Sequence, residues 1–143
     1  MAEVRIDRVF EAPREEVFAA WTHPDRVAAW YGPGGMEVPA DRVRIDAHVG
    51  GRWEVTMVRP DGGAIPIGYE IIELDEPGLL VLRSDPMPEM GMTEPTVVRV
   101  ELSDEGGKTR LVLTDGPMPE SGAGPAEAGY TAALDKLAAL LIG

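Results

Sequence analysis

The chain has 143 residues, a formal net charge of −12 at pH 7 and no cysteine. A chain of this length is expected to form one domain whose core is large enough to fold without disulfide bonds. The lack of cysteine excludes disulfides, thiolate zinc sites and cysteine nucleophiles. Because the charge is strongly negative and the basic residues form no run, nucleic acid and anionic membrane surfaces are unfavourable partners.

No apolar stretch approaches the roughly 20 residues that span a bilayer. The first residues also lack the apolar segment of a signal peptide, so we expect a cytoplasmic protein without membrane insertion. The sequence has neither Asn nor Gln, and most of its basic residues are Arg, which indicates a GC-rich bacterial genome.

The N-terminal third predicts one strand followed by two short helices. Residues 4–10 alternate between apolar and polar side chains, as in a half-buried strand. Pro13 stands where a helix tolerates proline, and apolar residues up to Trp21 recur at helical spacing. A second short helix carries Trp30 and is ended by a Gly-Pro pair.

The middle of the chain predicts an antiparallel meander. Strand-length segments alternate with turn signals such as Pro-Asp-Gly-Gly and Asp-Glu-Gly-Gly, which supply the backbone angles of tight connections. With the first strand, the predicted sheet has seven strands: 4–10, 38–45, 53–59, 64–74, 79–84, 96–103 and 108–114.

One long helix is predicted at the C-terminal end. Residues 85–95 and 116–125 show no period and are rich in Pro and Gly, so both are predicted to be mobile loops. Residues 126–142 place one apolar stripe on a helix: Tyr130, Leu134, Leu137, Ala138 and Leu141. This helix must cover the sheet, and because a single helix is narrower than so wide and twisted a sheet, the topology predicts a cavity between them.

The sequence resembles a known family along almost its whole length. Residues 8–24 and 30–35 resemble the activator of heat-shock protein 90 ATPase homologue family, of the START-like (SRPBCC) superfamily. The resemblance continues through residues 50–53, 60–62, 69–71, 106–111 and 129–137. It implies a single α+β domain over residues 1–143 with a helix-grip, birch-pollen-allergen-like fold: a seven-stranded antiparallel sheet curved around a long C-terminal helix, with two short helices after the first strand.

What the resemblance implies is a fold and a cavity more than an activity. Superfamily members bind lipids, sterols, hormones or polyketides, and a few cyclise or dehydrate them, so the fold alone does not select a function. The co-chaperone that names the family has two domains, and this chain matches the C-terminal one. The sequence departs from the family pattern at Tyr31 and Tyr130, where Trp is more typical, and at Met36, where an aromatic residue is common.

We expect ten residues to contact a small hydrophobic ligand in the cavity. They come from the short helices, the strands, a methionine-rich loop and the long helix: Trp30, Trp53, Val55, Met57, Tyr69, Arg83, Met87, Met90, Tyr130 and Leu134. Two alternatives compete with this assignment. Trp21 and Trp30 are more simply explained by anchoring their helices to the sheet. Met87, Met90 and Met92 either pack on the sheet edge, which is the simpler assignment, or form an adaptable cover over a pocket.

No metal, cofactor or catalytic residue is predicted. His23 and His48 lie far apart in the sequence without a set of neighbouring ligands, whereas a zinc or iron site requires three or four donors. The glycine pairs do not form a phosphate-binding loop, because none joins a strand to a helix with the required lysine.

Four charged residues, Arg8, Arg52, Glu70 and Arg83, lie within or beside apolar strands. A shift of one residue in strand register decides whether each faces the core or solvent. Exposure is the simpler assignment, since a buried charge without a partner is costly. An inward Arg52 or Arg83 would orient a carboxylate, phenolate or enolate on the ligand.

Three functions remain open from the sequence. The first is the binding of a small hydrophobic molecule without catalysis. The second is a polyketide cyclase- or dehydratase-like enzyme, in which Arg52, Tyr69, Arg83 or Tyr130 polarises a carbonyl group, and it requires at least two of these groups to converge. The third is a co-chaperone-like interaction with a heat-shock protein 90 ATPase, and a homodimer is a further open expectation.

Overall fold

The computed structural model describes residues 1–32, 35–88 and 93–142. These residues contain seven strands: β1 (Ala2–Phe10), β2 (Val43–Ile45), β3 (Arg52–Val58), β4 (Ala64–Asp75), β5 (Leu79–Ser84), β6 (Val97–Glu105) and β7 (Lys108–Met118). They also contain four helical elements: α1 (Arg14–Thr22), α2 (Pro24–Trp30), the 3₁₀ turn η1 (Ala40–Arg42) and α3 (Glu120–Ile142).

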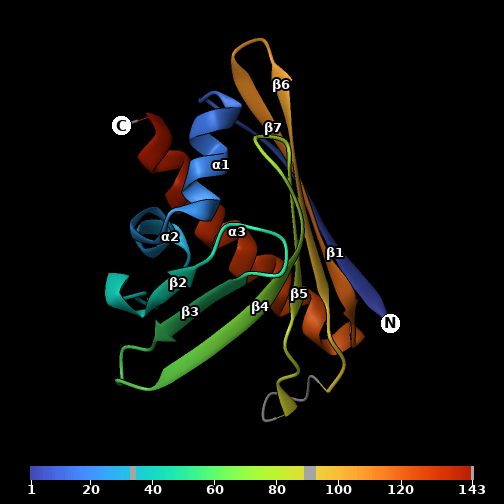
Figure 1. Ribbon diagram of the computed structural model, residues 1–143. Coiled ribbons are helices and arrows are strands. Elements are labelled where there is room, and N and C mark those ends of the chain that lie inside the picture. The colour runs from blue at the N-terminus through green and yellow to red at the C-terminus, as the bar shows by residue number, and fades with distance from the viewer. Residues whose placement is uncertain (33–34, 89–92, 143) are drawn as a thin grey trace.

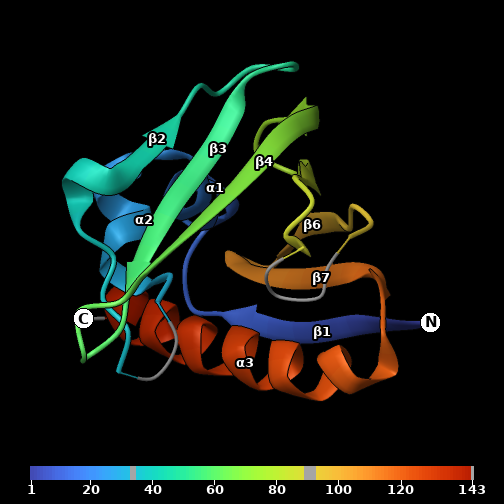
Figure 2. The ribbon, with the colours of Figure 1, turned by 90° about the horizontal axis from the view of Figure 1, so that it is seen from below.

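All strands join one antiparallel sheet in the order β1-β7-β6-β5-β4-β3-β2 (Figure 1). The sheet is strongly twisted, so that β3 and β4 run at a steep angle to β1 and β7 (Figure 2). The long helix α3 lies along β1, and α1 and α2 lie between α3 and the β2–β4 end of the sheet. The predicted helix-grip architecture is confirmed.

The two faces of the sheet differ in chemistry, as the alternating sequence predicts. The face toward the helices carries buried apolar side chains such as Leu111 and Leu113 of β7 and Val98 of β6. The opposite face carries cross-strand ion pairs, for example Arg110 with Asp7. The core therefore lies between the sheet and the three helices.

The short helices form where the sequence places them. Pro13 precedes α1, and Glu15 and Glu16 lie in its first turn, where negative charge is favourable. Pro24 opens α2, because its missing N–H needs no partner at that position. Trp21 of α1 and Trp30 of α2 are both buried, so each helix turns its tryptophan into the core.

Two regions of the chain differ most from the sequence prediction. Residues 38–45 form a strand only at Val43–Ile45, because Pro39 cannot donate to a ladder and the chain makes the η1 turn after it. The predicted mobile loop at 116–125 is wrong. Its first residues continue β7, with Ala2 opposite Met118, and the rest belongs to α3, which begins at Glu120 despite a proline in its second turn.

The other predicted loop, residues 85–95, is described only at 85–88 and 93–95, and neither part belongs to a named strand or helix. Met90 and Met92 lie outside the described residues. Among the described helices, none is long and apolar enough to cross a membrane.

Candidate ligand site between the sheet and the long helix

Five aromatic side chains form a continuous row from the short helices to the inner face of the sheet. We call Trp21, Trp30, Tyr31, Trp53 and Tyr69 the aromatic row. Successive rings meet edge to face, with centroids 4.8, 5.5, 5.0 and 5.6 Å apart, which is the favoured geometry for aromatic pairs. All five side chains are buried.

Indole hydrogen bonds fix this row to the backbone. Trp30 Nε1 donates to the carbonyl oxygen of Ala20 over 2.9 Å, and Trp53 Nε1 donates to that of Trp21 over 2.7 Å. Both bonds are buried, and together they tie α1 to α2 and to β3. The sequence-based alternative that Trp21 and Trp30 anchor their helices thus agrees with their contacts.

The aromatic row ends where a row of polar residues begins on the inner face. Tyr69 of β4 lies opposite Ser84 of β5, and Ser84 Oγ accepts hydrogen bonds from the backbone N–H and the hydroxyl of Thr96 over 2.8 and 3.1 Å. Asp115 follows on β7, in the inward alternation of Leu111 and Leu113. We call Tyr69, Ser84, Thr96 and Asp115 the polar row.

The long helix closes the polar row through one hydroxyl group. Tyr130 of α3 donates a hydrogen bond from its hydroxyl to Asp115 Oδ2 over 2.7 Å. Burial raises the pKa of Tyr130 and of Tyr31 well above the usual value. Burial also raises the pKa of Tyr69 to about 12, and the nearby hydroxyl groups of Tyr31 and Tyr130 partly offset that rise. The three phenols therefore lie close together and stay protonated at neutral pH.

Asp115 is the only carboxylate that the described residues bury, and it is incompletely paired. Asp115 is only 7% exposed, and its Oδ1 atom has no hydrogen-bond partner among the described residues. Burial raises the pKa of this carboxyl group, and the hydrogen bond from Tyr130, with the Thr96 hydroxyl nearby, partly offsets that rise. No Lys, Arg or His of the described chain forms an ion pair with it.

Most of the ten residues that the sequence assigns to the ligand lie in the core between the inner face of the sheet and the helices. Trp30, Trp53, Val55, Tyr69 and Leu134 are buried. Met57 and Tyr130 are partly buried and pack against the same core. The remaining three are elsewhere or undescribed: Arg83 is exposed, Met87 lines a groove on the outer face, and Met90 lies outside the described residues.

Arg52 and Arg83 do not face the interior. Arg83 donates to Glu70 Oε1 over 2.6 Å on the outer face, with its side chain 48% exposed. Arg52 pairs with Glu54 and with Asp85, and this second pair covers Gly68, where a side chain would collide with both partners. Neither arginine is placed to orient an anionic group on an interior ligand. Arg8 lies over the Phe10 ring and pairs with Asp135 of α3.

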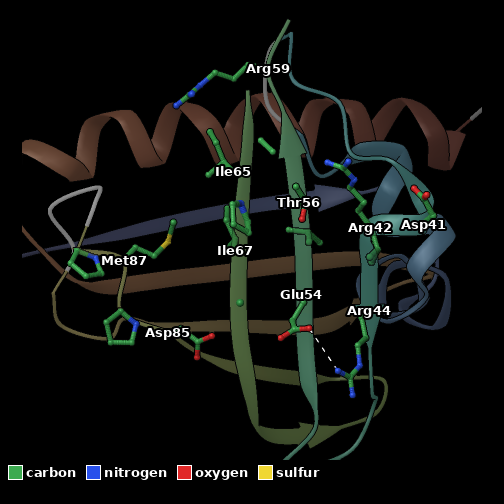
Figure 3. A pocket seen from close by; sticks show the side chains of 17 residues that line it. Asp41, Arg42, Arg44, Glu54, Thr56, Arg59, Ile65, Ile67, Asp85 and Met87 are labelled. Atoms are coloured by element: carbon green, nitrogen blue, oxygen red, sulfur yellow. Dashed lines mark ion pairs between the residues drawn. The ribbon is translucent and has the colours of Figure 1, made fainter. Parts of the chain in front are cut away.

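Two hollows lie outside this region. A groove of about 830 Å³ runs over the outer face of β2, β3 and β4, between Arg42, Arg44, Glu54 and Thr56 on one side and Asp85 and Met87 on the other (Figure 3). A second hollow of about 390 Å³ lies between α2, residues 36–39 and Lys136 of α3. Trp53, Tyr69, Tyr130 and Asp115 line neither hollow.

Sequence reasoning missed Asp115, Thr96 and Tyr31 as site residues. The Thr-Asp-Gly sequence near the end of β7 has the composition of a turn, so local preference predicts that the strand ends at Thr114. Extending the alternation of Leu111 and Leu113 by one step would have placed Asp115 on the inner face. In the described residues, no group of three or more potential ligands could hold a metal ion.

Comparison with known proteins identifies relatives of the same architecture. A protein of Chromobacterium violaceum is 22% identical, with a TM-score of 0.87 over 99% of this chain and 98% of that one. The AHSA1 protein of Silicibacter pomeroyi is 25% identical, with a TM-score of 0.85 over the same shares of the two chains. The AHSA1-like protein of Aeromonas hydrophila is 23% identical, with a TM-score of 0.79 over 94% and 88%.

No curated protein matches the sequence. A family model does match, under the description "Activator of Hsp90 ATPase homolog 1-like protein", and it covers residues 11–142. The match includes α1, α2, six of the seven strands and α3, and therefore nearly all of the residues described above. The chain belongs to the Activator of Hsp90 ATPase homolog 1-like family.

Proposed function

We propose that the protein binds a small, mostly apolar molecule between the inner face of the sheet and α3, with the polar end of that molecule at Asp115 and Tyr130. The observation that carries this proposal is the unpaired Oδ1 atom of Asp115. Buried polar atoms in folded proteins nearly always have a partner, and leaving one without costs about 1–3 kcal/mol. A donor from outside the chain removes this cost.

The helix above the polar row is built from small residues, which favours an occupant there. In the first half of α3, the half-buried positions beside Tyr130 are Gly122, Ala123, Ala126 and Gly129. In the second half, the same stripe carries the fully buried Leu134 and Leu137. The interface between the sheet and α3 thus has large side chains of the helix at one end and small ones at the end where Asp115 lies.

An apolar body for the ligand follows from the neighbouring surfaces. Trp53, Tyr69 and Tyr31 present rings toward the interior, and apolar contact is the main source of affinity in small-molecule sites. The few polar groups at one end would fix the orientation of the ligand.

A second candidate is an enzyme that acts on a carbonyl compound in the same place. It requires at least two of the groups at Arg52, Tyr69, Arg83 and Tyr130 to converge. Tyr69 and Tyr130 lie near each other and near Asp115, so that each affects the pKa of the other, whereas the two arginines face outward. Two protonated phenols can donate hydrogen bonds to a carbonyl oxygen, and the neighbouring carboxylate can act as a base. The enzyme and the binding protein would thus use the same site, and only conversion of the bound compound distinguishes them.

Native mass spectrometry of the protein purified from its own host tests the binding proposal. We expect a retained small-molecule mass in the wild type and a clear loss of occupancy in Ala126→Leu, which fills space beside Tyr130. The matched control is Ala128→Leu, the same change at an exposed position of the same helix. Full-length protein without any retained mass, or equal occupancy in the two variants, would contradict the proposal. Chemical conversion of the retained compound by the wild type would favour the enzyme instead.

A further inference from the structure

Among the described residues, the buried carboxylate of Asp115 forms no ion pair with a basic side chain. Arg52 and Arg83 are paired on the outer face, and Arg8, in the inward alternation of β1, is paired with Asp135 of α3. The two histidines, His23 and His48, are exposed. A buried charge without a partner of opposite sign is costly, so the interior has an unmatched preference for a cation.

The surroundings of Asp115 are aromatic on the side toward the core. Tyr69 and Tyr130 lie beside it, and Tyr31 and Trp53 follow in contact along the aromatic row. The faces of such rings attract cations, and cages of aromatic rings are a recurrent way to bind organic ammonium groups. The free carboxylate oxygen can therefore accept a hydrogen bond from an ammonium group, and the aromatic rings can contact the apolar part of the same molecule.

The charge of the whole chain acts in the same direction. A net charge of −12 attracts cations and repels anions over the full surface. We propose that the ligand of the interior site is an organic amine, bound as its ammonium ion, whose N–H donates to Asp115 Oδ1 and whose apolar body lies along Trp53 and Tyr69. This inference rests on the proposed function and specifies the class of ligand.

The state of Asp115 sets the pH at which such a ligand binds. The titratable and charged groups that face it or act on it are Tyr130 of α3, Tyr69 of β4, Tyr31 after α2 and Glu3 of β1. The tyrosines remain neutral across the physiological range, so Asp115 is the group that changes charge. Burial raises the pKa of Asp115, and the ammonium ion is expected to lose affinity as the pH falls through that raised value.

Three probes with one common body test the inference. Phenethylammonium, 2-phenylethanol and phenylacetate share a phenyl ring and differ in carrying a positive, neutral or negative end. Titration of the full-length protein, followed by NMR chemical shifts, is expected to give a dissociation constant about tenfold lower for phenethylammonium than for 2-phenylethanol, since charge-assisted hydrogen bonds are the stronger class. Phenylacetate is expected to bind most weakly.

Variants of equal charge separate the local carboxylate from the general surface field. Asp115→Asn is expected to remove the preference for the ammonium probe over the alcohol, whereas Asp135→Asn, on the exposed side of α3, is expected to retain it. If Asp115→Asn does not fold, the position of the chemical-shift changes on the wild type decides, because binding at Asp115 shifts the amides of Asp115 and Tyr130 whereas attraction to the general surface charge does not. Equal affinity of the three probes, preference for phenylacetate, or no binding of any probe overturns the inference. A neutral molecule retained in native mass spectrometry would overturn it while leaving the proposed function in place.

Discussion

Tyr130 of α3 donates a hydrogen bond of 2.7 Å to Asp115 of β7, and this bond joins the long helix to the inner face of the sheet at its polar end. It satisfies one oxygen of the buried carboxylate and leaves the other open. The fold and the candidate site meet in this pair, because the same two residues join the helix to the sheet and form the polar end of the proposed ligand site.

Tyr130→Phe tests the structural part of this relationship. The substitution removes the donor to Asp115 Oδ2 and leaves a buried carboxylate with fewer partners, so we expect the free energy of unfolding in urea to fall by about 1–3 kcal/mol. Thr131→Ala, on the exposed side of the same helix, is the control. In a double-mutant cycle with Asp115→Asn, additive effects would show that the two side chains do not interact.

The pH dependence of stability tests the burial of Asp115. Burial raises the pKa of Asp115 in the folded protein above its ordinary value of 3.8, so the folded state binds its proton more tightly than the unfolded state does. The charged carboxylate therefore lowers stability at neutral pH, and this loss is recovered as the pH falls through the raised pKa toward 3.8.

We accordingly expect Asp115→Asn to be more stable than the wild type at pH 7, with a difference that shrinks between pH 7 and about pH 4. Urea unfolding of both proteins at several pH values measures this difference. A difference that is independent of pH would mean that Asp115 titrates like an exposed carboxylate.

Trp53→Phe tests the aromatic row. Trp53 is fully buried, and its indole N–H donates to the carbonyl oxygen of Trp21, so the change leaves a small cavity and an unpaired acceptor. We expect a loss of about 2 kcal/mol in the free energy of unfolding. Val49→Ala, at a side chain 61% exposed, should change it little. An equal effect at the two positions would contradict the packing described here.

Arg83→Gln tests the outward orientation of the arginines. The ion pair with Glu70 is half exposed, so its loss is expected to cost less than about 1 kcal/mol. Occupancy by a retained ligand in native mass spectrometry should stay at the wild-type value. A marked fall in occupancy would place Arg83 in contact with the ligand after all.

Most of the fold followed from periodicity because the inner and outer faces of its strands differ so clearly. The last four residues of β7 and the first six residues of α3 could not be predicted in this way, since Gly and Pro between 116 and 125 indicate a loop by local preference. Pairing of Ala2 with Met118, more than 100 residues apart in the chain, overrides that preference.

The candidate site was predicted less completely for a related reason. For large apolar residues such as Trp53 and Leu134, the residue type alone predicts burial. The burial of Asp115 depends instead on strand register and on the packing of Tyr130, which lies on α3. The outward orientation of Arg52 and Arg83 likewise depends on register, and their ionic partners could not be identified from the sequence.

Chemical-shift mapping of the protein with phenethylammonium and with 2-phenylethanol locates the site most directly. Both probes carry the same phenyl ring, so this experiment locates the binding site whether or not the protein prefers the ammonium group to the alcohol. We expect saturable shifts that are largest at the backbone amides of Thr96, Asp115 and Tyr130, around the polar row. Shifts confined to Arg44, Thr56 and the other residues of the outer groove would contradict a ligand site between the sheet and α3.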